Sequence, residues 1–456
     1  MLSQLRICVN SQTPFVKFNL SYKELVEKYK SLGNPVRLDE LERGVDYQYT
    51  PGGVTAMLFP LLNRMHSQGI IQDPIWVSLA ANAPEEVDVD HIRLFHVQLP
   101  DNDVERYANF KESIWNEIHG IGNFVIKPEE YEAFIRYNWL SSQVMLKLLR
   151  DTDLYFIHDF QQLLTGGLIG PSAPAVLEWH IPFRLESVSP RLRAFVLKNI
   201  EGFDSMIVST RRDLEGLIHA GYRGHAYQIY PYVEPKKWTK ATREGLERFD
   251  AVVRRKPNEK ILLIVARMDP IKAQDTAIRA LSELSKSRDD LKLVLIGNGS
   301  FSGSSQGGLS MPKSTVWKQH LQDLVSETKL KDKVIFAGYQ PDEVIKAAFE
   351  SSDVTLIPSR AEGFGLTTIE SWIYKTPVIV SDGAGSSELV VDDVNGFTFK
   401  ADNSKDLSEK IERMLQNGER ASKMGEKGFD SAAICDIDRS IASLKRVFEE
   451  TLASYR

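Results

Sequence analysis

The sequence predicts an α/β protein with two domains, each built around a parallel β-sheet. Its 456 residues exceed what one hydrophobic core ordinarily holds, so two domains are expected. Short apolar stretches alternate with helical patterns, most regularly from residue 260 to residue 400, which favours parallel strands joined by right-handed crossovers. Several apolar stretches end in glycine-containing turns, and ligands bind at such strand ends in open α/β sheets.

The composition excludes several classes of protein. An apolar content of 42% with 26% charged residues is typical of a soluble globular protein, and the net charge of −6 argues against a nucleic-acid partner. Cys8 and Cys435 lie too far apart in sequence for a metal motif or a disulfide framework, which favours a reducing compartment. No stretch reaches the ~18 apolar residues of a membrane span. We therefore expect a cytoplasmic protein without a membrane span.

A glycine pair near the N-terminus is the first candidate for ligand binding. Residues 5–9 predict a buried strand, and Gly52 and Gly53 precede an apolar helical pattern at 56–65. Glycine allows close approach of a ligand to the backbone, and a helix start offers unpaired N–H groups to an anion or a sugar. A tight loop without a ligand is the alternative.

Two histidines follow apolar strands in the same half of the chain. Residues 154–157 predict a strand buried on both faces, with His158 and Asp159 at its carboxyl end. Residues 176–179 predict another strand, which ends at His180. A histidine in such a position is more often a structural hydrogen-bonding group than a catalytic one, so both interpretations stay open. Two prolines within 228–235 favour an extended connector and a domain boundary near 235.

The second half places two cations in one turn. Residues 261–266 predict a strand, and Arg267 and Lys272 lie in the turn that follows it. Two positive charges at the carboxyl end of a central strand would stabilise a departing diphosphate directly, whereas solvent-facing basic residues are the alternative. The Gly- and Ser-rich stretch 297–310 predicts a loop, either a neutral surface insertion or a substrate lid. Residues 395–399 predict a small hairpin-like strand.

The segment 353–374 reads as a strand, a glycine-containing turn and a helix. Glu362 lies in the turn, and Glu370 lies about 12 Å further along the helix at 1.5 Å per residue. One carboxylate could therefore hold a sugar ring while the other holds a ribose of the same ligand. The alternative is a helix cap and a solvated glutamate, since acidic residues favour helix N-termini.

The run Glu362-Gly-Phe-Gly-Leu366 together with Glu370 resembles the Glu-x7-Glu motif of retaining glycosyltransferases of the GT-B fold. This large family, of the glycosyltransferase family 4 type, includes sucrose and trehalose synthases. The resemblance implies two Rossmann-like domains whose parallel sheets face each other across a cleft. Residues 1–235 would bind the acceptor, residues 236–436 would bind the nucleotide-sugar donor, and a last helix at 437–456 would cross back to the first domain.

The resemblance also implies roles for individual residues. His158-Asp159 and His180-Ile-Pro-Phe183 resemble the pattern of trehalose-forming enzymes, and the Arg–Lys pair five positions apart matches the family. The implied catalytic residues are His158, Arg267, Lys272 and Glu362. The implied donor-binding residues are Gly52, Gly53, Gly297, Gly363, Phe364, Gly365, Leu366 and Glu370. Asp159 and His180 would lie on the acceptor side.

The implied reaction transfers a glucosyl or similar group, with retention, from UDP-, ADP- or GDP-glucose to a small sugar. No carboxylate nucleophile is evident on the first domain, so front-face substitution is favoured over covalent double displacement. Glucose or glucose 6-phosphate is the first choice of acceptor, giving trehalose or a similar disaccharide. Sucrose-phosphate-type and glycosylglycerate-type synthases, a nucleotide-sugar epimerase or hydrolase, and a non-catalytic sugar-nucleotide sensor are alternatives. No cofactor or metal is expected, and a homo-oligomer stays open.

Overall fold

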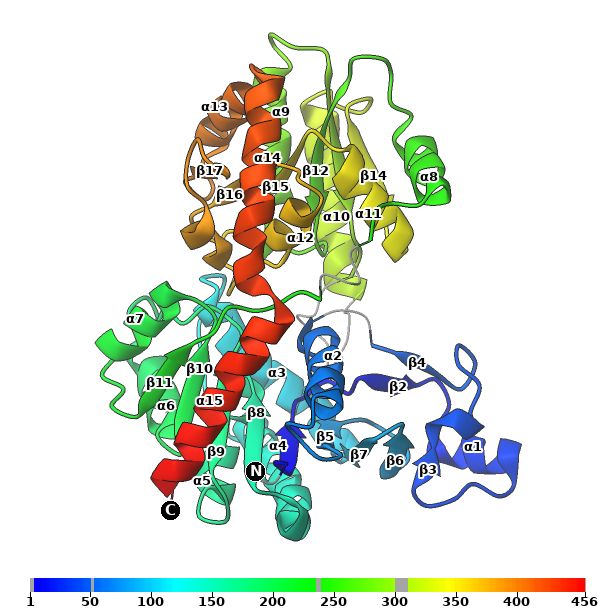
Figure 1. The fold of residues 1–456 in the computed structure, drawn as a ribbon, viewed down its shortest axis with the longest axis vertical. Helices are drawn as coiled ribbons and strands as arrows, with labels where there is room; N and C mark the ends of the chain where they lie inside the picture. Colours follow the sequence, from blue (N-terminus) through cyan, green and yellow to red (C-terminus); the bar gives the residue numbers. More distant parts are fainter. Residues whose placement is uncertain (1–3, 51–52, 235–238, 300–310, 456) are drawn as a thin grey trace. The chain divides into compact units, whose positions relative to one another are not determined.

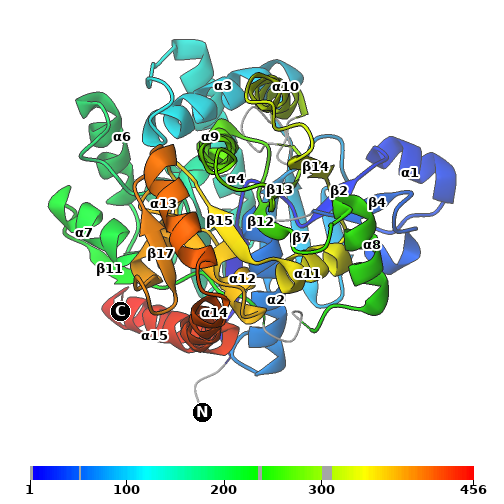
Figure 2. The ribbon, with the colours of Figure 1, turned by 90° about the horizontal axis from the view of Figure 1, so that it is seen from above.

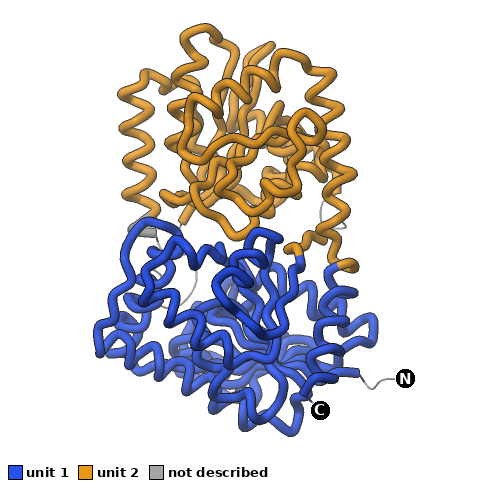
Figure 3. Tube along the Cα trace, turned by 90° about the vertical axis from the view of Figure 1, so that its left-hand side faces the viewer, with its two compact units in different colours: residues 1–229, 303–308, 440–456 blue, residues 230–302, 309–439 orange. Residues whose placement is uncertain are grey.

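The computed structural model describes residues 4–50, 53–234, 239–299 and 311–455. These residues form two compact units, which Figure 3 distinguishes by colour. Unit 1 contains the described residues up to 229 and those from 440 onward, and unit 2 contains the described residues from 230 to 439. Figure 1 labels the helices and strands of both units.

Unit 1 is built around a sheet that has nine strands within its described residues, in the order β11-β10-β9-β8-β1-β5-β7-β6-β3. The strands are β1 (Ile7–Asn10), β3 (Val36–Arg37), β5 (Ile75–Leu79), β6 (Glu86–Val89), β7 (Ile92–Val97), β8 (Leu154–His158), β9 (Ala175–Trp179), β10 (Ser205–Val208) and β11 (His225–Gln228). Neighbouring strands pair in parallel except β6 and β7, which are antiparallel. A separate antiparallel pair joins β2 (Val16–Phe18) to β4 (Tyr47–Tyr49).

Helices cover both faces of this sheet. The α-helices in the described part of unit 1 are α1 (Tyr22–Tyr29), α2 (Gly53–Ser67), α3 (Asp101–Ile118), α4 (Pro128–Lys147), α5 (Thr165–Ile169), α6 (Pro190–Ile200), α7 (Arg211–His219) and, from residue 440 onward, α15 (Ile437–Tyr455). The core that includes α3, α4 and α6 contains Tyr155, Ile157 and Leu177 of β8 and β9. Phe156 points to the opposite face and packs edge-on against Phe448 of α15 at 5.1 Å between ring centroids. Alternation along the strand thus buries both faces.

The C-terminal helix α15 is held to unit 1 by polar contacts as well. The hydroxyl groups of Ser205 and Thr451 lie 2.7 Å apart in a buried hydrogen bond. The Tyr227 hydroxyl donates to Glu450 at 2.8 Å, and the Tyr455 hydroxyl donates to the carbonyl of Gly170 at 2.8 Å. From residue 440 the helix therefore belongs to the N-terminal unit although it ends the chain.

Unit 2 is built around a sheet with six parallel strands in its described part, in the order β14-β13-β12-β15-β16-β17. The strands are β12 (Lys260–Val265), β13 (Leu291–Ile296), β14 (Val334–Gly338), β15 (Val354–Ile357), β16 (Val378–Ser381) and β17 (Gly396–Phe399). The α-helices are α8 (Arg243–Val253), α9 (Gln274–Leu284), α10 (Met311–Glu327), α11 (Asp342–Ser351), α12 (Thr367–Ile373), α13 (Ser404–Leu415) and α14 (Gly418–Ala432).

The central strand β12 shows why this sheet is buried on both faces. Leu262 and Ile264 join the core formed with α9, α10 and α13, whereas Ile261 and Leu263 join the core formed with α8 and α11. Figure 2 shows α9 and α10 on one side of β12 and α11 on the other. Period-two alternation with two apolar faces produces the near-continuous apolar run KILLIV in the sequence.

The two-domain α/β class with parallel sheets is therefore confirmed. The expectation of a hairpin-like strand at 395–399 is wrong, because β17 pairs with β16 in parallel, with Ile379 opposite Phe397. The connection between them contains a 3-10 helix (Gly385–Leu389), so it works as a crossover rather than as a tight turn. None of the helices in the described part of the chain is both long enough and apolar enough to cross a membrane.

Candidate functional site

Unit 2 brings Lys272 and Glu362 into direct contact. Lys272 ends a 3-10 helix (Pro270–Lys272) in the turn after β12, and Glu362 lies in the turn after β15. These strands are neighbours, with Leu263 opposite Thr355, so their carboxyl ends lie at one edge of the sheet. The Lys272 Nζ donates to Glu362 Oε1. The Ser359 hydroxyl donates to Glu362 Oε2 at 2.7 Å.

The charges around Glu362 keep its carboxylate ionised. Burial opposes ionisation, but the Lys272 charge, hydrogen bonds from Lys272 and Ser359, and the Arg267 charge together lower the pKa of Glu362. Burial lowers the pKa of Arg267, while the charges of Asp269 and Glu362 oppose that shift. Arg267, Lys272 and Glu362 therefore lie in one electrostatically coupled group.

Glu370 lies in the first turn of α12 and has a different environment. Burial raises the pKa of Glu370 to about 7, and the negative charges of Asp342 and Glu362 contribute to the same shift. The two glutamates of the motif thus differ. Cations hold Glu362 ionised, whereas Glu370 has a pKa raised to about 7. Helix α12 spans only Thr367–Ile373, so its dipole is small.

Glycine residues allow the chain to turn tightly between β15 and α12. Gly365 has a φ of +97°, and a Cβ atom there would lie 3.4 Å from Glu362 Oε2. Gly363 and Phe364 are buried, and the Phe364 ring packs 5.8 Å from the Tyr230 ring in the core. Leu366 caps α12. For Phe364, only the backbone therefore remains available to touch a ligand.

Gly297 lies where β13 ends and also has a steric reason to be glycine. Its φ is +136°, and a Cβ atom there would overlap the carbonyl oxygen of Ala266 at the end of β12. The rest of the predicted loop, residues 300–310, lies outside the described residues. In unit 1 the same is true of Gly52, whereas Gly53 begins α2 with a φ of +68°.

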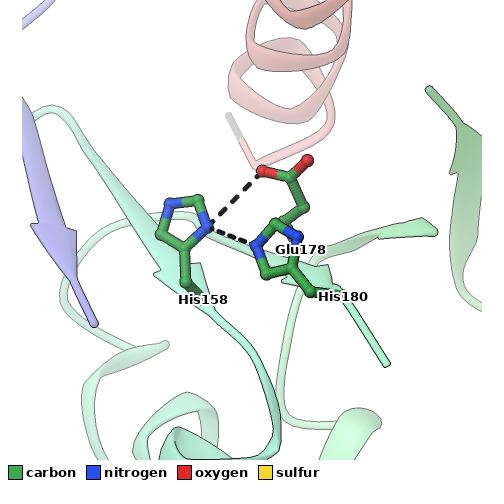
Figure 4. A group of neighbouring side chains, drawn as sticks. All are labelled: His158, Glu178 and His180. Atoms are coloured by element: carbon green, nitrogen blue, oxygen red, sulfur yellow. Dashed lines mark hydrogen bonds and ion pairs between the residues drawn. The ribbon is translucent and has the colours of Figure 1, made fainter. Parts of the chain in front are cut away.

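Unit 1 gathers the two predicted histidines around a carboxyl group that the sequence analysis did not assign. The Nδ1 atom of His158 lies 3.1 Å from the Nε2 atom of His180 and 3.4 Å from Oε2 of Glu178 (Figure 4). His158 and Glu178 are direct neighbours across β8 and β9. His158 and Glu178 are buried and His180 is half-buried.

Burial dominates the ionisation of this group. It lowers the pKa of His158 well below its ordinary value, with His180 adding to the shift, and it lowers the pKa of His180 to about 4. Burial also raises the pKa of Glu178 to about 8, and the charge of Asp159 adds to that shift. At neutral pH the three side chains are therefore largely uncharged.

Asp159 adopts a backbone conformation that is rare for a residue with a side chain. Its φ is 68° and its ψ is 175°. Burial raises the pKa of Asp159 to about 7, against hydrogen bonds from the backbone of Phe160, His180 and Ile181. Its backbone N–H donates to the carbonyl of Glu178 at 2.7 Å. Strained backbone of this kind clusters at functional sites.

Arg360 is a further residue beside the site that the sequence analysis did not assign. Its Nη2 atom donates to both carboxylate oxygens of Asp275, at 3.0 and 2.8 Å, and its Nε atom lies 2.7 Å from Asp402 Oδ1. Its Nη1 atom donates to the carbonyl of Pro270. Arg360 thereby joins the turn after β15 to the turn that carries Lys272. A cation next to the motif was visible in the sequence, but its partners depend on tertiary structure.

Comparisons with known proteins identify the C-terminal part. Residues 247–431 match the family model of glycosyl transferases group 1. The D-inositol 3-phosphate glycosyltransferase of Nocardia farcinica is 30% identical over 180 residues, which cover 39% of this chain and 37% of the relative. The enzyme of the same name from Corynebacterium aurimucosum is 24% identical over 338 residues, covering 73% of this chain and 75% of the relative. The chain thus spans little more than a third of the first relative.

Solved structures match the whole fold. Sucrose-phosphate synthase of Thermosynechococcus elongatus superposes with a TM-score of 0.71 at 16% identity, covering 99% of this chain and 100% of that chain. An E. coli structure described as trehalose-6-phosphate bound with UDP-2-fluoro glucose gives 0.75 at 14% identity, covering 97% and 98%.

The fold class is therefore GT-B, as the Glu-x7-Glu resemblance implied. Residues 247–431, which carry Arg267, Lys272, Glu362 and Glu370, are a glycosyl transferases group 1 domain.

Proposed function

We propose that this chain is a retaining hexosyltransferase that moves a glucosyl or similar group from a nucleotide-sugar to a small sugar acceptor. The observation that carries the proposal is the group formed by Arg267, Lys272 and Glu362 within the matched domain. A nucleoside diphosphate departing from a sugar leaves negative charge, and preorganised cations stabilise such charge in the transition state.

Each residue of this group has a distinct role in the proposal. Arg267 and Lys272 take up the charge of the diphosphate, and Lys272 is held in position by its hydrogen bond to Glu362. Glu362 and the backbone amides of 363–365 contact the transferred sugar. Glu370 accepts hydrogen bonds from the ribose hydroxyl groups. No metal or other cofactor is needed at the leaving group.

Retention follows from a front-face substitution in this proposal. The acceptor hydroxyl attacks from the side on which the diphosphate departs, and a phosphate oxygen of the leaving group takes its proton. A covalent double displacement would require an ionised carboxylate from unit 1. Glu178, with a pKa raised to about 8, is mostly protonated at neutral pH and is a poor nucleophile.

The acceptor is proposed to be glucose or glucose 6-phosphate, which gives trehalose or its phosphate. The fold similarity to trehalose-6-phosphate and sucrose-phosphate synthases supports a phosphorylated hexose. The curated relatives favour a second candidate, because they are named D-inositol 3-phosphate glycosyltransferases. Glucose 6-phosphate and inositol 3-phosphate are both small phosphorylated polyols. We place the enzyme in the cytoplasm, where its two buried thiols, Cys8 and Cys435, stay reduced.

The test is a matrix of UDP-, ADP- and GDP-glucose against glucose, glucose 6-phosphate, fructose 6-phosphate, glycerate and inositol 3-phosphate. Mass spectrometry identifies the product and NMR its anomeric configuration. A product with inverted configuration, or free nucleotide without any glycosylated acceptor, would contradict the proposal. Arg267→Ala should lower kcat by about 10²–10³, the usual cost of losing one preorganised group for transition-state charge. Near-normal turnover by this variant would refute the role given to Arg267.

A further inference from the structure

The cluster of His158, Glu178 and His180 presents three metal-binding atoms within 4.8 Å of one another. Strands β8 and β9 are hydrogen-bonded neighbours, so the positions of His158 and Glu178 are fixed by the sheet. His180 directly follows β9. Figure 4 shows the Nδ1 atom of His158 facing both the imidazole of His180 and the carboxyl group of Glu178. Rigid strands thus hold the three groups together.

Hydrogen bonding alone does not satisfy these atoms. The Nδ1 atom of His158 offers either one proton or one lone pair, yet it faces two polar atoms, at 3.1 and 3.4 Å. If the protonated Glu178 donates to Nδ1, or if Nδ1 donates to His180 Nε2, the other contact has no hydrogen bond from Nδ1. A cation would accept electron pairs from all three atoms at once.

Two of the three separations among these atoms match a tetrahedral site, while the separation between His180 and Glu178 is longer but within 4.8 Å. Zinc lies about 2.0–2.2 Å from histidine nitrogen and carboxylate oxygen, which places two tetrahedral ligands about 3.3 Å apart. The two measured separations, 3.1 and 3.4 Å, lie on either side of that value. Two histidines and one glutamate also form a common ligand set for zinc sites that keep a fourth position open.

Burial supports a bound cation for a second reason. Glu178 and His158 are buried, so the Glu178 carboxyl group is mostly protonated by itself, and a bound cation would compensate the charge of its ionised form. The Nε2 atom of His158 is buried, and it has no hydrogen-bond partner among the residues that the structure describes. Ligation through Nδ1 would fix the proton of His158 on Nε2, which would then be a defined donor.

We propose that His158 Nδ1, His180 Nε2 and the Glu178 carboxylate bind one divalent transition-metal cation of the Zn²⁺ type. The fourth coordination position is open to water or to a ligand oxygen. This binding is a property of unit 1 and does not depend on the glycosyl transfer proposed above, which uses no metal at the leaving group.

The test is a titration of the full-length, chelator-treated protein with Zn²⁺ in competition with a chromophoric chelator. One equivalent should bind tightly. Glu178→Gln and His180→Ala should each weaken binding by about 100-fold or more, since loss of outer-shell partners alone costs about 10–100-fold. NMR of the ¹⁵N-labelled histidines of the wild type should show zinc on Nδ1 of one ring and on Nε2 of another.

A second histidine pair provides the matched control. His66 and His91 stack with ring centroids 4.0 Å apart, and His66 Nε2 lies 3.0 Å from Asp73 Oδ1. The His66→Ala variant should still bind one equivalent of Zn²⁺ with the affinity of the wild type. Circular dichroism and thermal unfolding identify any variant that fails to fold, and the NMR result on the wild type does not depend on the variants. Absence of tight binding by the wild type, loss of binding in His66→Ala, or unchanged affinity in folded Glu178→Gln would overturn the proposal.

Discussion

Lys272 and Glu362, 90 positions apart in sequence, form a hydrogen-bonded ion pair at the carboxyl edge of the unit 2 sheet. Only 11% of the Lys272 side chain and 20% of the Glu362 side chain are exposed, so water screens the pair weakly. The second carboxylate oxygen of Glu362 is held by Ser359. The pair therefore fixes one cation and one carboxylate in a defined geometry before any ligand arrives.

Lys272→Met should lower kcat by about 10²–10³, because a preorganised cation for the leaving group is lost. It should also destabilise unit 2 by roughly 3 kcal/mol, since removal of one partner leaves a buried charge uncompensated. Turnover with a nucleotide-sugar and chemical unfolding measure the two effects separately.

Lys292→Met is the matched control for this change. Lys292 is also buried and lies 2.9 Å from Glu259 Oε2, and it donates to the carbonyl of Arg254 at 2.8 Å. Its loss should reduce stability to a similar degree, while kcat of the folded fraction stays near that of the wild type. Equal losses of kcat in both variants would mean that Lys272 has only a structural role.

Glu370→Gln should change how stability depends on pH. Burial raises the pKa of Glu370 from 4.5 to about 7 in the folded state. A raised folded pKa means that the stabilisation is complete below pH 4.5 and is lost as pH rises to about 7, because the unfolded chain ionises first. The variant cannot ionise, so its stability relative to the wild type should increase over this interval, on the order of 1–3 kcal/mol.

Urea unfolding at several pH values between 4 and 8 measures this difference. If the Glu370→Gln difference stays constant across the interval, Glu370 titrates in the folded protein as it does in the unfolded chain. Glu370 would then not lie in the environment described above.

The sequence analysis placed the chemistry-bearing residues of unit 2 separately, in turns that follow apolar strands. The carboxyl ends of parallel strands meet at one edge, which explains why the turns after β12 and β15 lie close together in the structure. Lys272 and Glu362 illustrate this reasoning. The same logic placed His158 and His180 after β8 and β9, where their rings now lie 5.4 Å apart.

The sequence could not predict which other side chains complete these groups. Strands buried on both faces lack the alternation that specifies register, so nothing in the sequence indicated that Glu178 lies opposite His158. The contacts of Arg360 with Asp275 and Asp402 likewise depend on how separate turns meet. The parallel direction of β17 depends on the crossover before it, which the short apolar run 396–399 does not reveal.

Gly297→Ala should destabilise unit 2 by more than about 1–2 kcal/mol, the cost of a left-handed conformation for a residue with a Cβ atom. The backbone φ of +136° and the overlap of the new Cβ with the Ala266 carbonyl act together. Gly418→Ala is the matched control, because a Cβ at this helix start meets nothing within 4 Å. It should be neutral or stabilising by up to about 1 kcal/mol. Equal thermal stability of the two variants would refute the steric role of Gly297.

Asp159 offers a test of whether strain is stored beside the histidine cluster. With φ 68° and ψ 175°, this residue occupies a region that glycine adopts readily and other residues do not. Its side chain nevertheless accepts a hydrogen bond from the backbone of His180, with Oδ1 at 3.4 Å. Removing the side chain therefore relieves strain and loses hydrogen bonds at the same time.

Two substitutions separate these effects. Asp159→Ala loses the hydrogen bonds and keeps the strain, whereas Asp159→Gly loses the same bonds and removes the strain. The glycine variant should therefore be more stable than the alanine variant by about 1–2 kcal/mol. Glycine ordinarily costs about 0.5–1 kcal/mol relative to alanine in regular structure, so the expected order is the reverse of the usual one. Urea unfolding of both variants gives the difference directly, and an alanine variant as stable as the glycine variant would show that the backbone at residue 159 relaxes without strain.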